Sequence, residues 1–144
     1  MPAPLRHMCR SVSVDAPPER VFAFHLDPAN ASAVSPPGTR VRVQADTVPL
    51  TEGAEAEMSV VAGRVPLGRG WRIRVDEIIP GRLMVDVAVR SPFARWRHEH
   101  RFEPTGDGTL MTDRVTYAVR GGRAGDLAIG AFTAAALRLV FRGR

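Results

Sequence analysis

The sequence predicts an α+β fold in which a curved antiparallel sheet of about seven strands wraps round one long C-terminal helix, with two short helices after the first strand. Two alternating segments, 96–103 and 111–117, flank the turn-forming segment Pro104–Gly108, a pattern typical of an antiparallel hairpin. The period of a helix is sustained over Asp126–Arg142. Short connections favour antiparallel pairing, and the apolar face of such a sheet needs the long helix as its cover.

A strand and two short helices are expected at the N-terminal end of the chain. The strand spans His7–Val14, and the first helix spans Glu19–Leu26 after two prolines that suit a first helical turn. Asp15 is placed to cap this helix, because a carboxylate accepts hydrogen bonds from backbone N–H groups. The second helical segment runs from Asp27 through Ala33.

Four further segments alternate with a period of two and complete the sheet ahead of the hairpin. They are Arg40–Val48, Ala54–Ala62, Trp71–Ile79 and Leu83–Arg90. Gly63–Gly70 is rich in glycine but lacks the Lys-Ser/Thr pair and the following helix of a phosphate-binding loop. We expect it to form a mobile hairpin loop at the mouth of a cavity.

The long C-terminal helix should lay its apolar side on the sheet. Its apolar residues fall at helical spacing: Leu127, Ile129, Phe132, Ala136, Leu137, Val140 and Phe141. Glycine and alanine keep much of this helix slim, so it can pack closely at some points and leave space at others. Phe132 is therefore a candidate for contact with a ligand.

The hairpin carries the candidate functional residues. Trp96, His98, His100 and Phe102 share the inner face of one strand, and Met111, Asp113, Val115 and Tyr117 share one face of the next. Asp86 joins them from the preceding strand if Met84 and Ala88 also face inward. Polar groups on a buried face need hydrogen-bond partners, water or a ligand, so function is expected here.

Acid–base catalysis is the chemistry that fits these residues. An aspartate that accepts a hydrogen bond from an imidazole N–H fixes the tautomer of the ring and raises its basicity. His98, His100 and Asp113 could then remove a proton beside a carbonyl group and drive aldol-type cyclisation and dehydration, with the second histidine or Tyr117 as the proton donor. The alternative is that these residues only line a binding cavity.

No metal or other cofactor is expected. A His-x-His strand beside a carboxylate is a known ligand geometry, and imidazole suits zinc or iron. A firm third ligand is not evident, because His25 lies on the first short helix and His7 near the N-terminus. Trp71 and Trp96 either stack on an aromatic ligand or belong to the core.

Composition narrows the class of protein. The 144 residues, of which 44% are hydrophobic, suffice for one domain spanning residues 1–144. The chain has no lysine, so arginine supplies all the positive charge behind the net charge of +5. The arginines are interleaved with acidic residues along the strands, so no nucleic acid is expected as a partner.

The single cysteine, Cys9, excludes an internal disulfide and should be a small core residue. Without a signal peptide or a membrane-length apolar segment, a soluble cytoplasmic protein is expected, and a homodimer is left open.

Segments 90–104 and 108–115 resemble the SRPBCC superfamily of START-like, helix-grip proteins. The likeness is closest to the bacterial ligand-binding branch related to polyketide cyclase/dehydratase proteins, through a Trp-x-His-x-His-x-Phe strand and a Gly-Thr-x-Met-x-Asp strand. The chain departs from that branch at Ala88, where a polar residue is expected, and at Ser91, which replaces a glycine of the following turn. The resemblance implies a hydrophobic ligand such as a lipid, sterol or polyketide, and Ala88 makes the implied cavity less polar.

Three functions compete at this point. The first is cyclisation or dehydration of a small, mostly apolar carbonyl compound of polyketide type, with Asp86, Trp71, Trp96, Phe102, Met111, Tyr117 and Phe132 around the substrate. The second is the same cavity used for binding, transport or sensing. The third is a protein-interaction module of the chaperone-activator type. The first two predict an enclosed pocket with converging polar groups, and the third predicts an exposed apolar patch.

Overall fold

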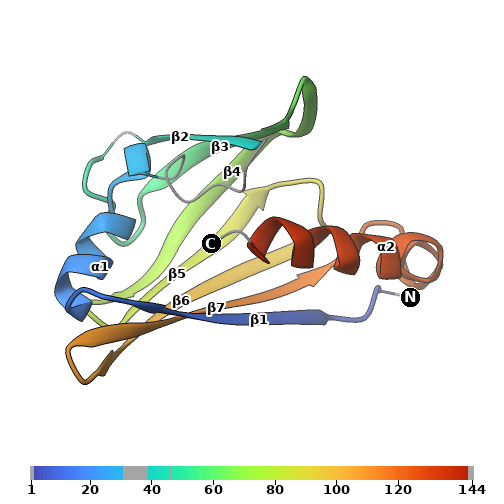
Figure 1. Ribbon diagram of the computed structural model, residues 1–144. Coiled ribbons are helices and arrows are strands. Elements are labelled where there is room, and N and C mark those ends of the chain that lie inside the picture. The colour runs from blue at the N-terminus through green and yellow to red at the C-terminus, as the bar shows by residue number, and fades with distance from the viewer. Residues whose placement is uncertain (1, 31–38, 46, 143–144) are drawn as a thin grey trace.

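Figure 1 shows a computed structural model of the protein, which describes residues 2–30, 39–45 and 47–142. The elements, in chain order, are β1 (Arg6–Val14), α1 (Pro18–His25), β2 (Thr39–Ala45), β3 (Glu55–Ala62), β4 (Val65–Ile79), β5 (Leu83–Arg90), β6 (Arg95–Thr105), β7 (Gly108–Ala118) and α2 (Gly122–Arg142). The order agrees with the pattern of alternating and helical segments in the sequence.

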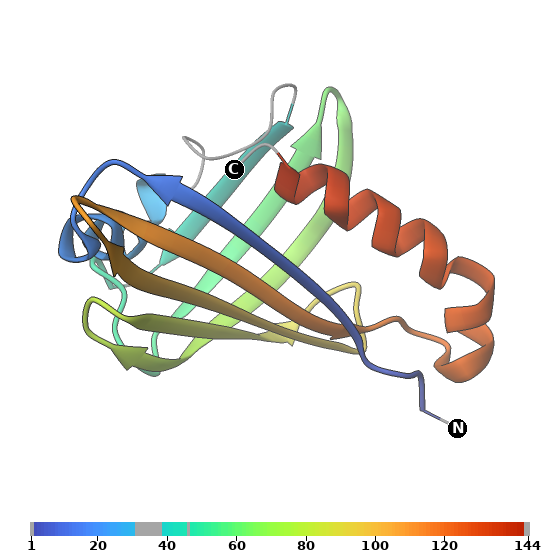
Figure 2. The same cartoon turned by 60° about the horizontal axis from the view of Figure 1, so that its bottom comes forward.

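The seven strands form one antiparallel sheet in the order β1-β7-β6-β5-β4-β3-β2. Each strand pairs with the next in sequence, except that β1 returns to pair with β7, from Arg6 opposite Tyr117 to Val14 opposite Thr109. The sheet curls strongly, with α1 at one end and α2 across its open side (Figures 1 and 2). The predicted helix-grip fold is confirmed, and it brings the faces of β5, β6 and β7 together inside the curve.

The central hairpin is longer than the sequence pattern suggested. Thr105 pairs with Gly108, so only Gly106 and Asp107 form the turn. Gly106 has a positive φ of 50°, which glycine adopts at little cost in a tight hairpin turn. Pro104, expected in the turn, instead lies in β6 opposite Thr109.

The expectation of a loop at Gly63–Gly70 is wrong. Strand β4 begins at Val65, and only the two residues before it form the turn that follows β3. Val60 lies opposite Gly68 and Val61 opposite Pro66, with shifts of register that mark a bulge in the β3–β4 ladder. A ladder needs only backbone groups, and a bulge absorbs the mismatch, so glycine here did not end the strand.

Two expectations at the N-terminal end are also wrong. Pro17 is the N-cap residue of α1, without a side-chain cap, so Asp15 does not cap this helix. Cys9 is exposed, because the neighbouring Met8 takes the inner face of β1 and alternation turns Cys9 outward. Of the second helical segment, residues 28–30 form a single turn, and the part from residue 31 to Ala33 lies outside the described residues.

Two apolar clusters make up the core. The first cluster comprises Met8, Trp71, Trp96, Val115, Tyr117 and Val119, with Leu137 of α2 packed against it. The second cluster comprises Val21, Phe22, Leu50, Val75, Met84, Phe102 and Met111. On β6 the two histidines, His98 and His100, lie between Trp96 of the first cluster and Phe102 of the second, so the polar group divides the core.

Helix α2 is rotated differently from the orientation expected. Leu127 and Phe132 are 87% and 78% exposed, while Asp126 and Gly130 are buried against the sheet. Asp126 receives two hydrogen bonds from Arg6 of β1, at 2.7 and 3.1 Å, and a Cβ at Gly130 would collide with the same guanidinium. A charged contact and a glycine therefore form the inner side of α2 where Leu127, Ile129 and Phe132 were expected, while Leu137 packs on the first cluster as expected.

For Val140 and Phe141, which belong to the expected apolar side, the structure describes the helical backbone but not the side chains. Within the described residues, none of the helices combines the length and hydropathy that crossing a bilayer requires.

Candidate functional site

Four buried polar side chains from three adjacent strands meet between the two apolar clusters. Asp86 of β5 is opposite His98 of β6, and Asp113 of β7 is opposite His100 of β6. All four are buried, and Met84 is buried on the same face as Asp86. The alternation seen in the sequence therefore places Asp86, His98, His100 and Asp113 on one inner face.

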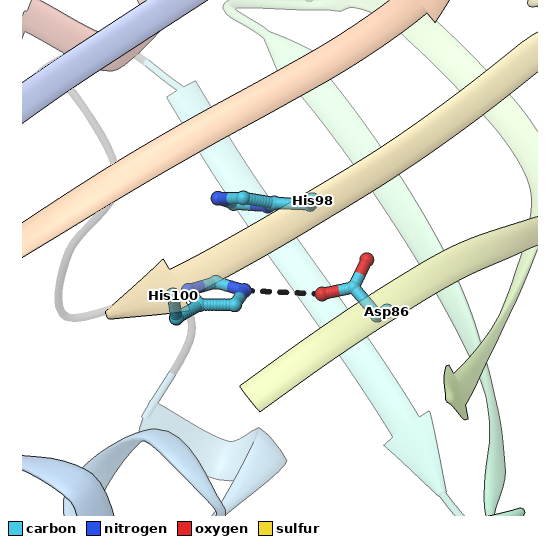
Figure 3. A group of neighbouring side chains, drawn as sticks. All are labelled: Asp86, His98 and His100. Carbon is cyan, nitrogen blue, oxygen red and sulfur yellow. Dashed lines mark hydrogen bonds and ion pairs between the residues drawn. The ribbon is translucent and has the colours of Figure 1, made fainter. Parts of the chain in front are cut away.

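The hydrogen bonds of this cluster cross diagonally between the strands. His98 Nε2 lies 2.7 Å from Asp113 Oδ1. His100 Nε2 lies 3.0 Å from Asp86 Oδ2 (Figure 3). Each histidine thus binds the aspartate that stands opposite the other histidine. The two imidazole rings stack with their centroids 3.8 Å apart and their planes 32° apart.

His100 contacts both aspartates. Its Nδ1 lies 3.3 Å from Asp113 Oδ1, an ion-pair distance at which the N–H direction falls short of a hydrogen bond. A ring with a carboxylate at each nitrogen is suited to carry two N–H groups, which means a positive charge. His100 therefore has the surroundings of an imidazolium ion.

Burial and charge push the pKa values of the two histidines in opposite directions. Burial alone would lower the pKa of His100, but its contacts with Asp113 and Asp86 outweigh burial and raise the pKa to about 9. Burial and the neighbouring charge of His100 lower the pKa of His98 in spite of its bond to Asp113. At neutral pH the pair therefore consists of a charged His100 and a neutral His98.

Asp113 remains ionised between the two rings. Burial would raise the pKa of its carboxyl group, but the hydrogen bonds and charges of His100 and His98 hold the pKa well below its usual range. An ionised carboxylate only accepts hydrogen bonds, so His98 donates from Nε2 and carries its basic lone pair on Nδ1. The cluster thus offers a base and an acid next to each other.

The same cluster offers a set of metal-ligating atoms. Asp86, His98 and His100 each supply one such atom, and these atoms lie within 4.8 Å of one another (Figure 3). Sequence analysis found no firm third ligand beside the two histidines. The structure brings Asp86 to that position, because the β5–β6 register sets it opposite His98.

His25 is a functional candidate that sequence analysis set aside. Its ring lies 6.1 Å from the ring of His100 and 5.3 Å from that of Phe102. Its Nδ1 lies 2.8 Å from the carbonyl oxygen of Val21, to which only an N–H can donate. The available signal was helical spacing, since His25 follows the buried Phe22 by three residues and so shares its side of α1.

The expected aromatic contacts are divided between the two apolar clusters. Trp71, Trp96 and Tyr117 belong to the first cluster, together with Phe93, which the sequence did not indicate. Phe102 and Met111 belong to the second cluster. Phe132, expected to touch a ligand, is turned to the outside of α2 and does not join them.

The two departures from the resembled family are local. Ala88 packs against the first cluster, and its methyl group adds no polar atom beside Trp71 and Trp96. The Ser91 hydroxyl accepts a hydrogen bond from the backbone N–H of Phe93 at 3.0 Å, so it holds the turn between β5 and β6.

Comparison with known proteins identifies the family. A family model described as "Polyketide cyclase / dehydrase and lipid transport" matches residues 14–140. No curated protein sequence matches the chain. Among solved structures, the aromatase/cyclase Zhui from a Streptomyces species is 18% identical, with a TM-score of 0.64, and the match covers 85% of this chain and 73% of that one.

Two further solved structures are similar over almost the whole chain. Ara h 8.0201 is 10% identical, with a TM-score of 0.66, and the match covers 97% of this chain and 95% of that one. A protein from Thermus thermophilus is 16% identical, with a TM-score of 0.67, and the match covers 96% of this chain and 88% of that one. These likenesses show the fold, and they agree with the resemblance to SRPBCC proteins.

Proposed function

Because the chain belongs to the polyketide cyclase/dehydrase and lipid transport family, we propose that it is a cytoplasmic protein that binds a small, largely hydrophobic carbonyl compound and catalyses its cyclisation or dehydration. The single observation that carries this proposal is the buried pair of stacked imidazoles, one neutral and one charged, between two aspartates. Such a pair supplies a base and an acid in the same place without a cofactor.

The proposed reaction begins at His98. Its neutral Nδ1 takes a proton from the carbon beside a ligand carbonyl, and the C–H electron pair becomes an enolate. The positive charge of His100 stabilises the negative charge on the enolate oxygen, which matters most in a site shielded from water. The enolate carbon then attacks a second carbonyl of the same molecule, and the new alkoxide takes back the proton from His98. A second proton removal at the same carbon expels the hydroxyl group as water, with His100 or Tyr117 as the acid.

The two aspartates are positioning residues in this scheme. Asp113 holds the Nε2–H of His98 and so leaves the basic lone pair on Nδ1. Asp86 holds His100 and favours its charged form. Neither carboxylate needs to touch the ligand.

A second candidate function is non-catalytic binding, as a carrier or sensor. It is favoured by the family description, which includes lipid transport, and by the first apolar cluster, which lies beside the histidines. A metal-assisted form of the reaction is favoured by the three ligand atoms of Asp86, His98 and His100. The experiment below separates these candidates from acid–base catalysis.

The test is turnover of a short linear δ-diketone, whose aldol closure and dehydration give a cyclohexenone that absorbs in the ultraviolet. His98→Ala and His100→Ala should each lower turnover by about 10²–10⁴-fold, the usual contribution of a positioned acid or base. His7→Ala is the matched control, because His7 is exposed on β1, where its Nδ1 lies 3.2 Å from the hydroxyl oxygen of Thr116.

Three outcomes would overturn the proposal. Equal rates with and without the protein mean that it does not catalyse this closure. An equal loss of turnover in His7→Ala means that the effect of the substitutions does not depend on the buried site. Stoichiometric zinc or iron in protein purified without a His tag, together with loss of turnover on its removal, replaces the acid–base scheme with the metal-assisted one.

A further inference from the structure

A buried donor in the first apolar cluster has no hydrogen-bond partner among the described residues. Trp71 is 7% exposed, and its Nε1–H is buried without an acceptor in the part of the chain that the structure describes. A buried N–H that loses its bond to water and gains none in the protein is costly, so native proteins rarely keep one without a reason. The indole of Trp71 therefore calls for an acceptor that the described residues do not supply.

The surroundings of Trp71 are apolar. Its ring packs edge-to-face on Phe93 and Trp96, with centroids 5.7 and 5.1 Å away. Ala3, Met58, Ala88 and Leu137 also pack against this cluster, and Leu137 belongs to α2. The cluster that holds the donor therefore contacts both the sheet and α2, and a ligand bound between them would lie beside this cluster.

The unpaired donor and the histidine pair are connected through one ring. Trp96 lies 5.1 Å from Trp71 and 6.4 Å from His98, and both rings stand nearly perpendicular to it, at 87° and 88°. A ligand that contacts Trp96 would thus lie close to the indole of Trp71 and to the His98–His100 pair.

We propose that Trp71 Nε1–H is a second polar anchor of the ligand site and donates a hydrogen bond to a carbonyl or ether oxygen of the ligand. This inference rests on the proposed function, because it takes the ligand to lie between the sheet and α2. It narrows the ligand class to flat, mostly hydrocarbon molecules with two oxygen functions. One oxygen accepts the bond from Trp71, and the other meets His98 and His100.

The test uses two bicyclic probes that differ by one oxygen atom. α-Tetralone has a carbonyl acceptor, and tetralin has the same fused rings without it. The chain has two tryptophans, so a proton–nitrogen correlation spectrum shows two indole N–H signals, and Trp71→Phe assigns them. We expect α-tetralone to shift the Trp71 indole proton downfield and tetralin to leave it in place.

Affinity gives the second measurement. Trp71→Phe keeps the aromatic ring and loses the donor, so it should weaken α-tetralone about five- to tenfold, the usual effect of one neutral hydrogen bond. The affinity for tetralin should stay within twofold. If the variant folds poorly, nuclear Overhauser contacts with the neighbouring His98 ring identify the Trp96 signal, so the wild-type spectrum still decides the question.

Several results would overturn this inference. An indole signal that α-tetralone leaves unchanged would mean that the N–H faces the ring of Phe93 or Trp96 instead. If neither probe binds at its solubility limit, flat and mostly hydrocarbon molecules are excluded as the ligand class. Failure of the proposed catalysis is a separate result, because a protein that only binds its ligand would still show the Trp71 shift and the loss in Trp71→Phe.

Discussion

Strand β6 carries charged pairs on both of its faces, and the two faces behave differently. On the outer face Glu99 contacts Arg97 and Arg101 at 3.2 Å each, with the arginine side chains 42% and 45% exposed and that of Glu99 14% exposed. On the inner face His98 and His100 contact their aspartates at 2.7 and 3.0 Å with almost no exposure. The distances are similar, so the difference between the faces comes from water.

Water decides what each pair can do. The outer pairs are screened, and such exposed pairs contribute about 0–1 kcal/mol each. The inner pairs have lost their hydration, so each charge depends on its neighbours, and the pKa values of His98 and His100 diverge. The same strand therefore has a solvated outer face and an inner face on which the two histidines differ in charge.

The largest expected effect is on the inner face. Asp113→Ala removes the carboxylate shared by both imidazoles and leaves the charge of His100 with Asp86 alone. Breaking a buried pair in this way costs about 3–5 kcal/mol of unfolding free energy. Glu99→Ala, the matched change on the outer face, should cost about 1 kcal/mol or less. Urea denaturation of both variants measures the difference, and equal losses would show that burial does not separate the faces.

An intermediate effect is expected from pH. The folded-state pKa of His100 lies above the unfolded value of 6.5, so its contribution to stability is complete below pH 6.5 and is lost as the pH rises through about 9. That loss amounts to up to about 3 kcal/mol. The pKa values of His98 and Asp113 are lowered, so their contributions are lost in the opposite direction, as the pH falls. Denaturation midpoints between pH 6 and pH 10 measure the alkaline loss.

Asp86→Asn provides the control for this pH dependence. Without the Asp86 charge, the pKa of His100 should fall by about one unit or more. The unfolding free energy lost as the pH rises should then be smaller, and the loss should be complete at a lower pH. Proton signals of the imidazole ring report the pKa directly. A pH dependence that is the same in this variant and in the wild type would assign it to some other group.

The smallest expected effect lies on the outer face. Arg101→Ala removes the contact with Glu99, and the unfolding free energy should fall by about 1 kcal/mol or less at low salt. The difference should shrink further in molar salt, because the Debye length there is only about 3 Å. Asp113→Ala should lose nearly as much in high salt as in low. A salt effect of the same size on both variants would contradict the comparison.

Local patterns predicted the inner face of β6 well. Alternation placed Trp96, His98, His100 and Phe102 inside, since successive side chains of a strand point to opposite faces. Asp113 followed from the hairpin, and Asp86 followed once Met84 was taken to face inward. Local patterns failed where a partner distant in sequence decided the outcome, as at the glycine-rich start of β4, which pairs with β3 across a bulge.

The sequence by itself determined the order of the elements, the antiparallel sheet and the inner side of β6, because these depend on periods of two and 3.6 residues that each segment carries alone. The tertiary structure decided the rest. The β5–β6 and β6–β7 registers crossed the His–Asp bonds, and the packing of α1 brought His25 to His100. The Arg6 guanidinium binds Asp126 and lies close to Gly130, and this contact fixes the side of α2 that faces the sheet, so Phe132 faces outward. Register and helix rotation depend on contacts between residues far apart in the chain, and no local period contains them.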